Sequence, residues 1–149
     1  MNTLSEITIC MVLYDESEEI ILKTLEKIKN FKIIIIDNKG DKELKNKISD
    51  KRVIIRKGSA SDLSKFMGEL NKEKADVIVS SLPLAILPKT LRKRIVIEAN
   101  KLLNENGEFI QFQYTLQSLK LFKKVFKTVT VRHCLFNMPP AFVYSCKKQ

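Results

Sequence analysis

The sequence is poor in the residues that most often carry metal-dependent or nucleophilic chemistry. It contains one histidine, three cysteines and no tryptophan in 149 residues. An odd number of cysteines without paired spacing favours neither a disulfide framework nor a zinc site, and free thiols fit a reducing cytoplasm. His133 lies on a predicted strand beside Cys134, so we interpret it as a packing or surface residue. No metal site is expected.

Glycine and long apolar runs are scarce as well. The chain has four glycines, none of them before Gly40. Its longest strictly aliphatic run, residues 33–36, is far too short to span a bilayer. The N-terminus has no cationic segment ahead of its apolar residues, so a signal peptide is not predicted either. Any contact with a membrane is therefore expected to be peripheral, from the cytoplasmic side.

The composition describes a folded protein with an excess of positive charge. The chain is 44% apolar and 30% charged, and its length suits one domain with one core. Lysine and arginine number 27 against 17 acidic residues, which gives a net charge of +10. Such an excess favours an anionic partner, either nucleic acid or an anionic lipid surface. The lysines are scattered, however, and most of them are expected to lie on solvated helix faces.

Strand and helix patterns alternate along the chain, which predicts an α/β fold with a doubly wound, mainly parallel, Rossmann-like sheet. Two final strands joined through Pro139 and Pro140 predict an antiparallel hairpin at one edge. We expect strands at residues 7–13, 32–38, 52–56, 75–80, 108–114, 128–135 and 141–146. Helices are expected at residues 20–28, 41–48, 61–70, 88–103 and 116–126, with a turn at 104–107.

The stretch from Ala75 to Leu84 organises these predictions. An acidic residue leads into a β-branched run that ends abruptly in two serines and Pro83, as expected of a buried parallel strand delivering a loop at its carboxyl end. Open α/β sheets bind their ligands at that edge. Proline stiffens such a loop and removes an N–H group, and we expect at least one loop carbonyl to be available to a ligand.

Three blocks resemble the bacterial phospholipid N-methyltransferases, which are class I S-adenosylmethionine-dependent enzymes that methylate phosphatidylethanolamine. The blocks are residues 76–84, 107–114 and 137–144, and the resemblance covers residues 51–149. It implies the class I methyltransferase plan, S-adenosylmethionine as cofactor and a phospholipid as acceptor. By this resemblance the loop after the fourth strand and Tyr114 lie at the reacting groups. The implied catalytic residues are Ser80, Ser81, Leu82, Pro83, Leu84 and Tyr114.

The first third of the chain departs from that family. A class I methyltransferase should follow its first strand with a glycine-rich turn, but residues 13–19 offer bulk and negative charge. Residues 7–48 instead resemble the opening of a family 2 glycosyltransferase, a strand that ends near a tyrosine followed by an aliphatic strand that ends in Asp37 and Asn38. We interpret the chain as a single composite domain, residues 1–149, joined near residue 50.

The expected cofactor contacts lie at the ends of the second, third and fourth strands. Asp37 is placed to accept hydrogen bonds from ribose hydroxyls, or else it only terminates its strand and caps a turn. Residues 58–63 resemble the family's Gly-Asp-Ala block, which implies that Ser59 and Ala60 face the adenine, with Ser59 in place of the acid. Asp62 is either a substitute for that acid or a helix N-cap. The resemblance adds Ser80 to the cofactor contacts.

Three functional hypotheses remain. The first is a phospholipid N-methyltransferase, whose positive surface helps it to reach an anionic membrane. The second is a non-catalytic nucleotide-binding or interaction domain that lost its cofactor site with the glycine turn. The third is adenine methylation in nucleic acid, which Leu82-Pro83-Leu84 disfavours because these residues can neither stack on nor hydrogen-bond a flipped base. A glycosyltransferase fragment is a further alternative, but a complete glycosyltransferase is not expected, since that family's metal motif is missing.

Overall fold

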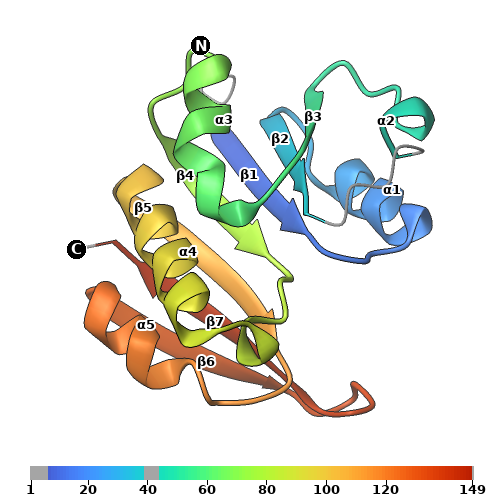
Figure 1. Cartoon of the computed structure of the whole chain (residues 1–149). Coiled ribbons are helices and arrows are strands. Elements are labelled where there is room, and N and C mark those ends of the chain that lie inside the picture. Colours follow the sequence, from blue (N-terminus) through green and yellow to red (C-terminus); the bar gives the residue numbers. More distant parts are fainter. Residues whose placement is uncertain (1–6, 39–43, 149) are drawn as a thin grey trace.

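The computed structural model describes residues 7–38 and 44–148, which form one seven-stranded sheet with helices on both faces (Figure 1). The strands are β1 (Thr8–Leu13), β2 (Lys32–Asp37), β3 (Val53–Lys57), β4 (Ala75–Ser80), β5 (Leu103–Gln113), β6 (Thr128–Cys134) and β7 (Ala141–Lys147). The helices are α1 (Glu18–Lys27), α2 (Leu44–Lys47), α3 (Leu63–Glu69), α4 (Lys89–Leu102) and α5 (Leu119–Val125). Two short 3₁₀ turns, Ala60–Asp62 and Leu84–Ile86, precede α3 and α4.

The strand order is β3-β2-β1-β4-β5-β7-β6. The first five of these strands run parallel, while β7 is antiparallel to both β5 and β6. The order reverses between β1 and β4, so their carboxyl ends open a crevice at the switch point of the sheet. This arrangement confirms the predicted doubly wound sheet with a closing antiparallel hairpin.

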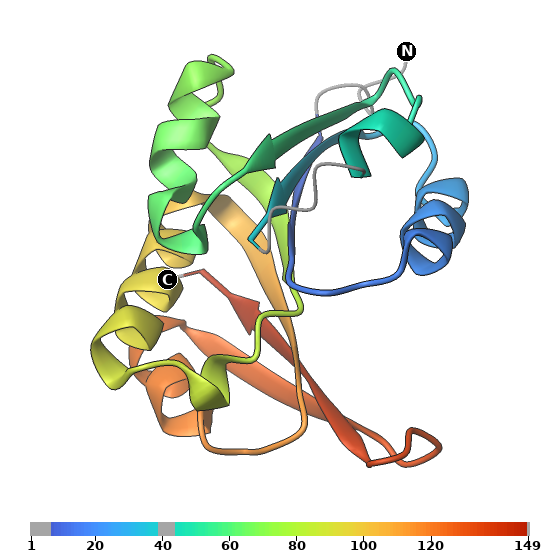
Figure 2. The same cartoon turned by 45° about the vertical axis from the view of Figure 1, so that its right-hand side comes forward.

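Alternate side chains of the central strands supply the two apolar layers. Ile34 and Ile36 point into the layer under α3, α4 and α5, whereas Ile33 and Ile35 point toward α1. All four are buried, as expected of a strand that is covered on both faces. Figure 2 shows that the helices on the second face, α1 and α2, cover only the β1–β3 half of the sheet. None of the described helices is long and apolar enough to cross a bilayer.

Some element boundaries differ from the predictions. The turn expected at residues 104–107 is wrong, because β5 already begins at Leu103 and this segment forms an irregularity within the strand. One residue of β4, Asp76, lies opposite the whole segment, and its carboxylate accepts a hydrogen bond from the Asn104 amide at 2.7 Å. Residues 41–43 of the helix expected at 41–48 lie outside the described residues.

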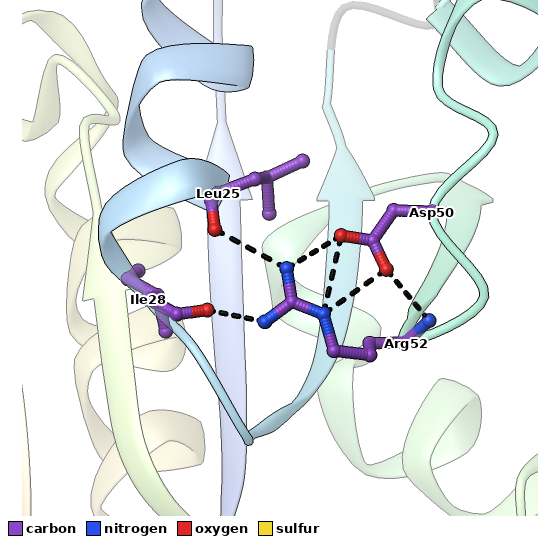
Figure 3. Close-up of polar contacts among 4 residues, drawn as sticks. All are labelled: Leu25, Ile28, Asp50 and Arg52. Atoms are coloured by element: carbon purple, nitrogen blue, oxygen red, sulfur yellow. Dashed lines mark hydrogen bonds and ion pairs between the residues drawn. The ribbon is translucent and has the colours of Figure 1, made fainter.

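An arginine directly before β3 connects this strand to the end of α1 (Figure 3). The Arg52 guanidinium donates to the carbonyls of Leu25, at 3.2 Å, and Ile28, and it pairs with the Asp50 carboxylate at 2.5 Å. A cation at a helix C-terminus satisfies carbonyls that have no partner within the helix and complements the macrodipole. The contact holds together segments on either side of residue 50.

Candidate functional site

The carboxyl ends of β1, β2, β4 and β5 surround two adjoining hollows. The first has a volume of about 170 Å³ and the second about 470 Å³. The segment Tyr14–Glu16, directly after β1, lines both hollows and is therefore the wall between them. A site of this kind can hold two ligands side by side, one on each side of the β1 loop.

Carboxylates dominate the lining of the first hollow among the described residues. Asp15, Glu16, Glu18 and Asp37 line it, together with Lys47 of α2. The Lys47 ammonium lies 3.2 Å from a Glu18 carboxylate oxygen, so part of the negative charge is balanced. This environment favours hydroxyl and ammonium groups over anions. The sequence did not predict Lys47 here, because residues 41–48 showed only a weak helical pattern.

In the loop after β1, a side chain bonds a backbone amide that a glycine-rich turn would leave accessible to a ligand. The Tyr14 N–H group donates to the Glu16 carboxylate at 2.9 Å. The next residue, Ser17, provides the carbonyl that accepts from the amides of Ile20 and Ile21 and thereby starts α1. The Tyr14 amide is therefore already hydrogen-bonded to the Glu16 carboxylate at this wall. We refer to these two bonded groups as the closed pair.

Asp37 is the final residue of β2, and its side chain lines the first hollow. It is 5% exposed, and its backbone carbonyl accepts from the Gly58 amide at 3.1 Å. The following residue, Asn38, accepts a hydrogen bond from the Ala60 amide through its side chain, also at 3.1 Å. These bonds fix the loops after β2 and β3 against each other at the carboxyl edge.

The loop after β3 shows why its first residue is a glycine. A Cβ atom added to Gly58 would lie 2.2 Å from Cζ of Phe66, a ring of α3 that packs against the core. The next residues engage one another, since the Ser59 hydroxyl accepts from the Ser61 amide at 3.2 Å. Asp62 occupies the predicted N-cap position of α3, but its side chain makes no capping hydrogen bond and instead pairs with Arg94 of α4 at 3.2 Å.

The predicted residues after β4 divide into two groups. Ser81 and Pro83 line the second hollow together with Tyr114, so the structure brings these three predicted residues to one place. Ser80, Leu82 and Leu84 lie beneath them, each 2% exposed or less. The Ser80 hydroxyl accepts from the Leu82 amide at 3.3 Å. Ser59, Ala60 and Asp62 line neither of the two hollows.

Two glutamines of β5, which the sequence analysis missed, hold the loop after β4. Gln111 and Gln113 both donate to the Leu82 carbonyl, at 2.9 and 2.7 Å. Both side chains are buried, and the amide oxygen of Gln111 has no hydrogen-bond partner among the described residues. The carbonyls of Pro83 and Leu84 also accept hydrogen bonds, within the turn that follows. These three carbonyls already have donors within the protein, so the availability of a loop carbonyl to a ligand stays a prediction.

The far wall of the second hollow is held by a buried tyrosine. Tyr144 of β7 donates its hydroxyl to the Thr115 carbonyl at 2.9 Å, next to Tyr114. Burial raises the pKa of Tyr144 to about 12, so the phenol stays protonated and remains a donor. The Tyr114 ring is 53% exposed and packs edge-on against Phe112, with 5.1 Å between centroids. The hollow therefore has mainly apolar walls, with two carboxylates at the β1 loop.

Among curated proteins, an ornithine lipid N-methyltransferase from Singulisphaera acidiphila is similar to this chain. The two are 29% identical over 91 residues, which cover 60% of this chain and 47% of the relative. No protein-family profile matches the chain. The chain spans about half the length of the curated relative that it matches.

Solved structures similar to the described fold include methyltransferases and a spermidine synthase. A Burkholderia thailandensis 1,6-didemethyltoxoflavin N1-methyltransferase, which holds its substrate and S-adenosylhomocysteine, superposes with a TM-score of 0.72 at 13% identity, covering 95% of this chain and 71% of that one. Human methyltransferase-like protein 13 in complex with S-adenosylhomocysteine gives 0.69 at 14% identity, covering 98% and 74%. A spermidine synthase with a transition-state analogue also gives 0.69, at 13% identity, covering 98% and 55%. The chain therefore has the class I methyltransferase fold, and the resemblance of its sequence to the S-adenosylmethionine-dependent methyltransferases is confirmed.

Proposed function

We propose that this chain binds S-adenosylmethionine and transfers its methyl group to an amine, with a lipid amine such as that of phosphatidylethanolamine as acceptor. The observation that carries the proposal is the pair of adjoining hollows at the switch point of the sheet, with the segment Tyr14–Glu16 as their common wall. Methyl transfer requires two ligands to meet end to end, and much of its rate comes from that positioning. The lipid amine is supported by the name of the curated relative.

The first hollow fits the ribose part of the cofactor. Asp37 lies at the end of β2, where its carboxylate can accept hydrogen bonds from a vicinal diol. S-adenosylmethionine would supply an activated methyl group on a sulfonium, a cation that the surrounding carboxylates favour. Its own carboxylate fits less well, because Glu16 already occupies the Tyr14 amide. Binding of the complete cofactor therefore requires Glu16 to leave this amide.

The second hollow fits an amine that carries an apolar body. Pro83, Phe112 and Tyr114 provide apolar surface, and the carboxylates of Asp15 and Glu16 attract an ammonium group. An amine attacks only in its neutral form, and a carboxylate at this wall can accept its proton directly or through water. At about 470 Å³ the hollow lies in the usual range for small-molecule sites, about 300–1,000 Å³.

Titration calorimetry with S-adenosylmethionine tests the proposal. We expect a micromolar dissociation constant, about −8 kcal/mol, and a loss of about tenfold or more for Asp37→Asn, because a charged acceptor is lost. Asp50→Asn makes the same chemical change at the opposite edge of the sheet and serves as the matched control. Equal affinity in the wild type and Asp37→Asn would contradict the assigned ribose contact. Methylation of phosphatidylethanolamine vesicles then tests the acceptor.

A second function is favoured by one observation, the closed pair of Tyr14 and Glu16. If Glu16 stays on this amide, the edge binds a nucleoside but excludes the amino-acid part of the cofactor, as in a non-catalytic nucleotide-binding domain. Adenosine distinguishes the two functions. Binding of adenosine without binding of S-adenosylmethionine, in protein shown to be folded by circular dichroism, would support the non-catalytic function and overturn methyl transfer.

A further inference from the structure

The loop between β6 and β7 exposes more apolar surface than folding of the chain explains. Leu135 is 72% exposed, Phe136 105% and Met138 94%. The six residues 135–140 read Leu-Phe-Asn-Met-Pro-Pro and carry no charge. Single exposed apolar side chains are ordinary, whereas three neighbours on one loop mark a surface that meets another apolar phase.

The loop lies at the edge of the sheet that carries the candidate site. Gln113, at the end of β5, is paired with Phe142 of β7, so residues 135–140 extend beyond the carboxyl end of β5. Figures 1 and 2 both show the hairpin projecting past the sheet. Tyr114 and Ile86, which line the second hollow, are 53% and 75% exposed. Apolar surface therefore extends from the hollow to the same edge as the hairpin loop.

The net positive charge of the chain is concentrated in its last third, which contains this loop. No aspartate or glutamate occurs after Glu108, whereas residues 109–149 contain seven lysines and arginines, which account for seven of the net ten positive charges. Those among the described residues are Lys120, Lys123, Lys124, Lys127, Arg132, Lys147 and Lys148. All but Lys148 lie on the exposed surface of α5, β6, β7 and their connections. Arg132 and His133 directly precede the strand end at Cys134.

We propose that the hairpin loop, residues 135–140, inserts into the interface of an anionic lipid bilayer and turns the second hollow toward the membrane. Apolar side chains that enter the interface and nearby cations attracted to anionic headgroups are together what reversible membrane binding requires. A nucleic acid could contact the cations here, but the exposed apolar side chains of Leu135, Phe136 and Met138 would gain nothing from its charged backbone. This inference rests on the proposed function, since it gives the lipid acceptor its route to the site.

The absence of tryptophan gives a direct test of insertion. Phe136→Trp places a single reporter on the hairpin loop. Its emission is expected to shift to shorter wavelength with vesicles of equal parts phosphatidylglycerol and phosphatidylcholine, and not with phosphatidylcholine alone. Leu22→Trp, on α1 at a position that is 39% exposed, is the control and should not shift. An unshifted Phe136→Trp variant that still sediments with anionic vesicles would overturn insertion of the loop.

A second pair of variants measures the contribution of the loop to binding. The double substitution Phe136→Ser and Met138→Ser is expected to lower the affinity for anionic vesicles about tenfold, because two apolar side chains no longer leave water. Ile20→Ser, an exposed position on α1, should bind like the wild type. Unchanged vesicle affinity in the double variant, or binding of a single-stranded oligonucleotide but not of vesicles, would overturn the proposal.

Cofactor titration without vesicles separates this inference from the proposed function. A double variant that keeps wild-type affinity for S-adenosylmethionine but loses vesicle binding supports both proposals. If vesicle binding is retained in the double variant while the cofactor still binds, only membrane insertion is overturned. If the wild type binds vesicles through the loop but binds no cofactor, the proposed methyl transfer is overturned and membrane insertion of the loop is still supported.

Discussion

The two glutamines that share the Leu82 carbonyl allow a sharp test of how the loop after β4 is held. Gln111→Met removes two hydrogen bonds, to the carbonyls of Leu82 and Phe112, both at 2.9 Å, but it also removes a buried amide oxygen that has no partner among the described residues. The two lost hydrogen bonds cost about 1–3 kcal/mol, and relief of the unpaired oxygen returns about 1–3 kcal/mol. We therefore expect Gln111→Met to be close to neutral. Gln113→Met loses two hydrogen bonds to the same carbonyls without such relief, so it should cost about 1–3 kcal/mol.

The double variant should behave differently from the sum of its parts. Each single variant leaves the Leu82 carbonyl one side-chain donor, but the double variant leaves it neither of the two. The carbonyl keeps the Leu84 amide as a donor, at 2.8 Å, so it is not left without a partner. Three donors share its two lone pairs, however, and loss of one glutamine can be partly compensated by the other, which should appear as a coupling free energy of about 0.5–1 kcal/mol between Gln111 and Gln113. Urea unfolding followed by circular dichroism measures it, as an extra shift of the midpoint of about 0.5 M. Strict additivity of the two substitutions would refute the shared-acceptor interpretation.

Two further predictions concern the loops on either side of β3. Gly58→Ala should destabilise the protein by about 1–3 kcal/mol, because its Cβ would meet the Phe66 ring at 2.2 Å. Gly68→Ala is the control and should be neutral or stabilising, because its Cβ would meet nothing within 4 Å. Equal melting temperatures for the two variants would contradict the packing argument. The hydrogen bond from Arg52 lowers the pKa of Asp50 below its ordinary value of 3.8, so this contact stabilises the fold above that pH and is lost as the pH falls through the lowered pKa. Asp50→Asn should therefore weaken the acid dependence of unfolding below about pH 4, and an unchanged profile would count against the ion pair.

The fold was predictable because its strands are encoded locally. The β-branched runs of β1, β2 and β4 and the helical spacing of apolar residues between them give the alternation that a parallel sheet requires. The start of β5 was not predictable, because Asn104, Asn106 and Gly107 form a sequence typical of a turn while the backbone continues along the strand. Similarly, apolarity alone could not distinguish the exposed Phe136 from the buried Phe126.

The candidate site was predictable where its residues follow a strand directly. Asp37 ends β2 and Ser81 directly follows β4, and the carboxyl edge brings them to the crevice. The residues that support the site depend on distant partners, such as Tyr144 and Thr115, which are 29 positions apart. Gln111 and Gln113 gave a signal that could have been used, since they share the strand face of Phe109 and are therefore polar groups in a core layer. The pairing of Glu16 with the Tyr14 amide has no signature in the sequence.

The position of β7 constrains the order in which the sheet can be completed. This strand is the last in the sequence, yet it lies between β5 and β6 and pairs with both along its length. β6 therefore cannot join the sheet until residues 141–147 have been synthesised. Until then the strand that it pairs with is still missing. A nascent chain stalled before residue 141 should expose β6 and α5 to chaperones and proteases, whereas the β1–β5 region can already be paired.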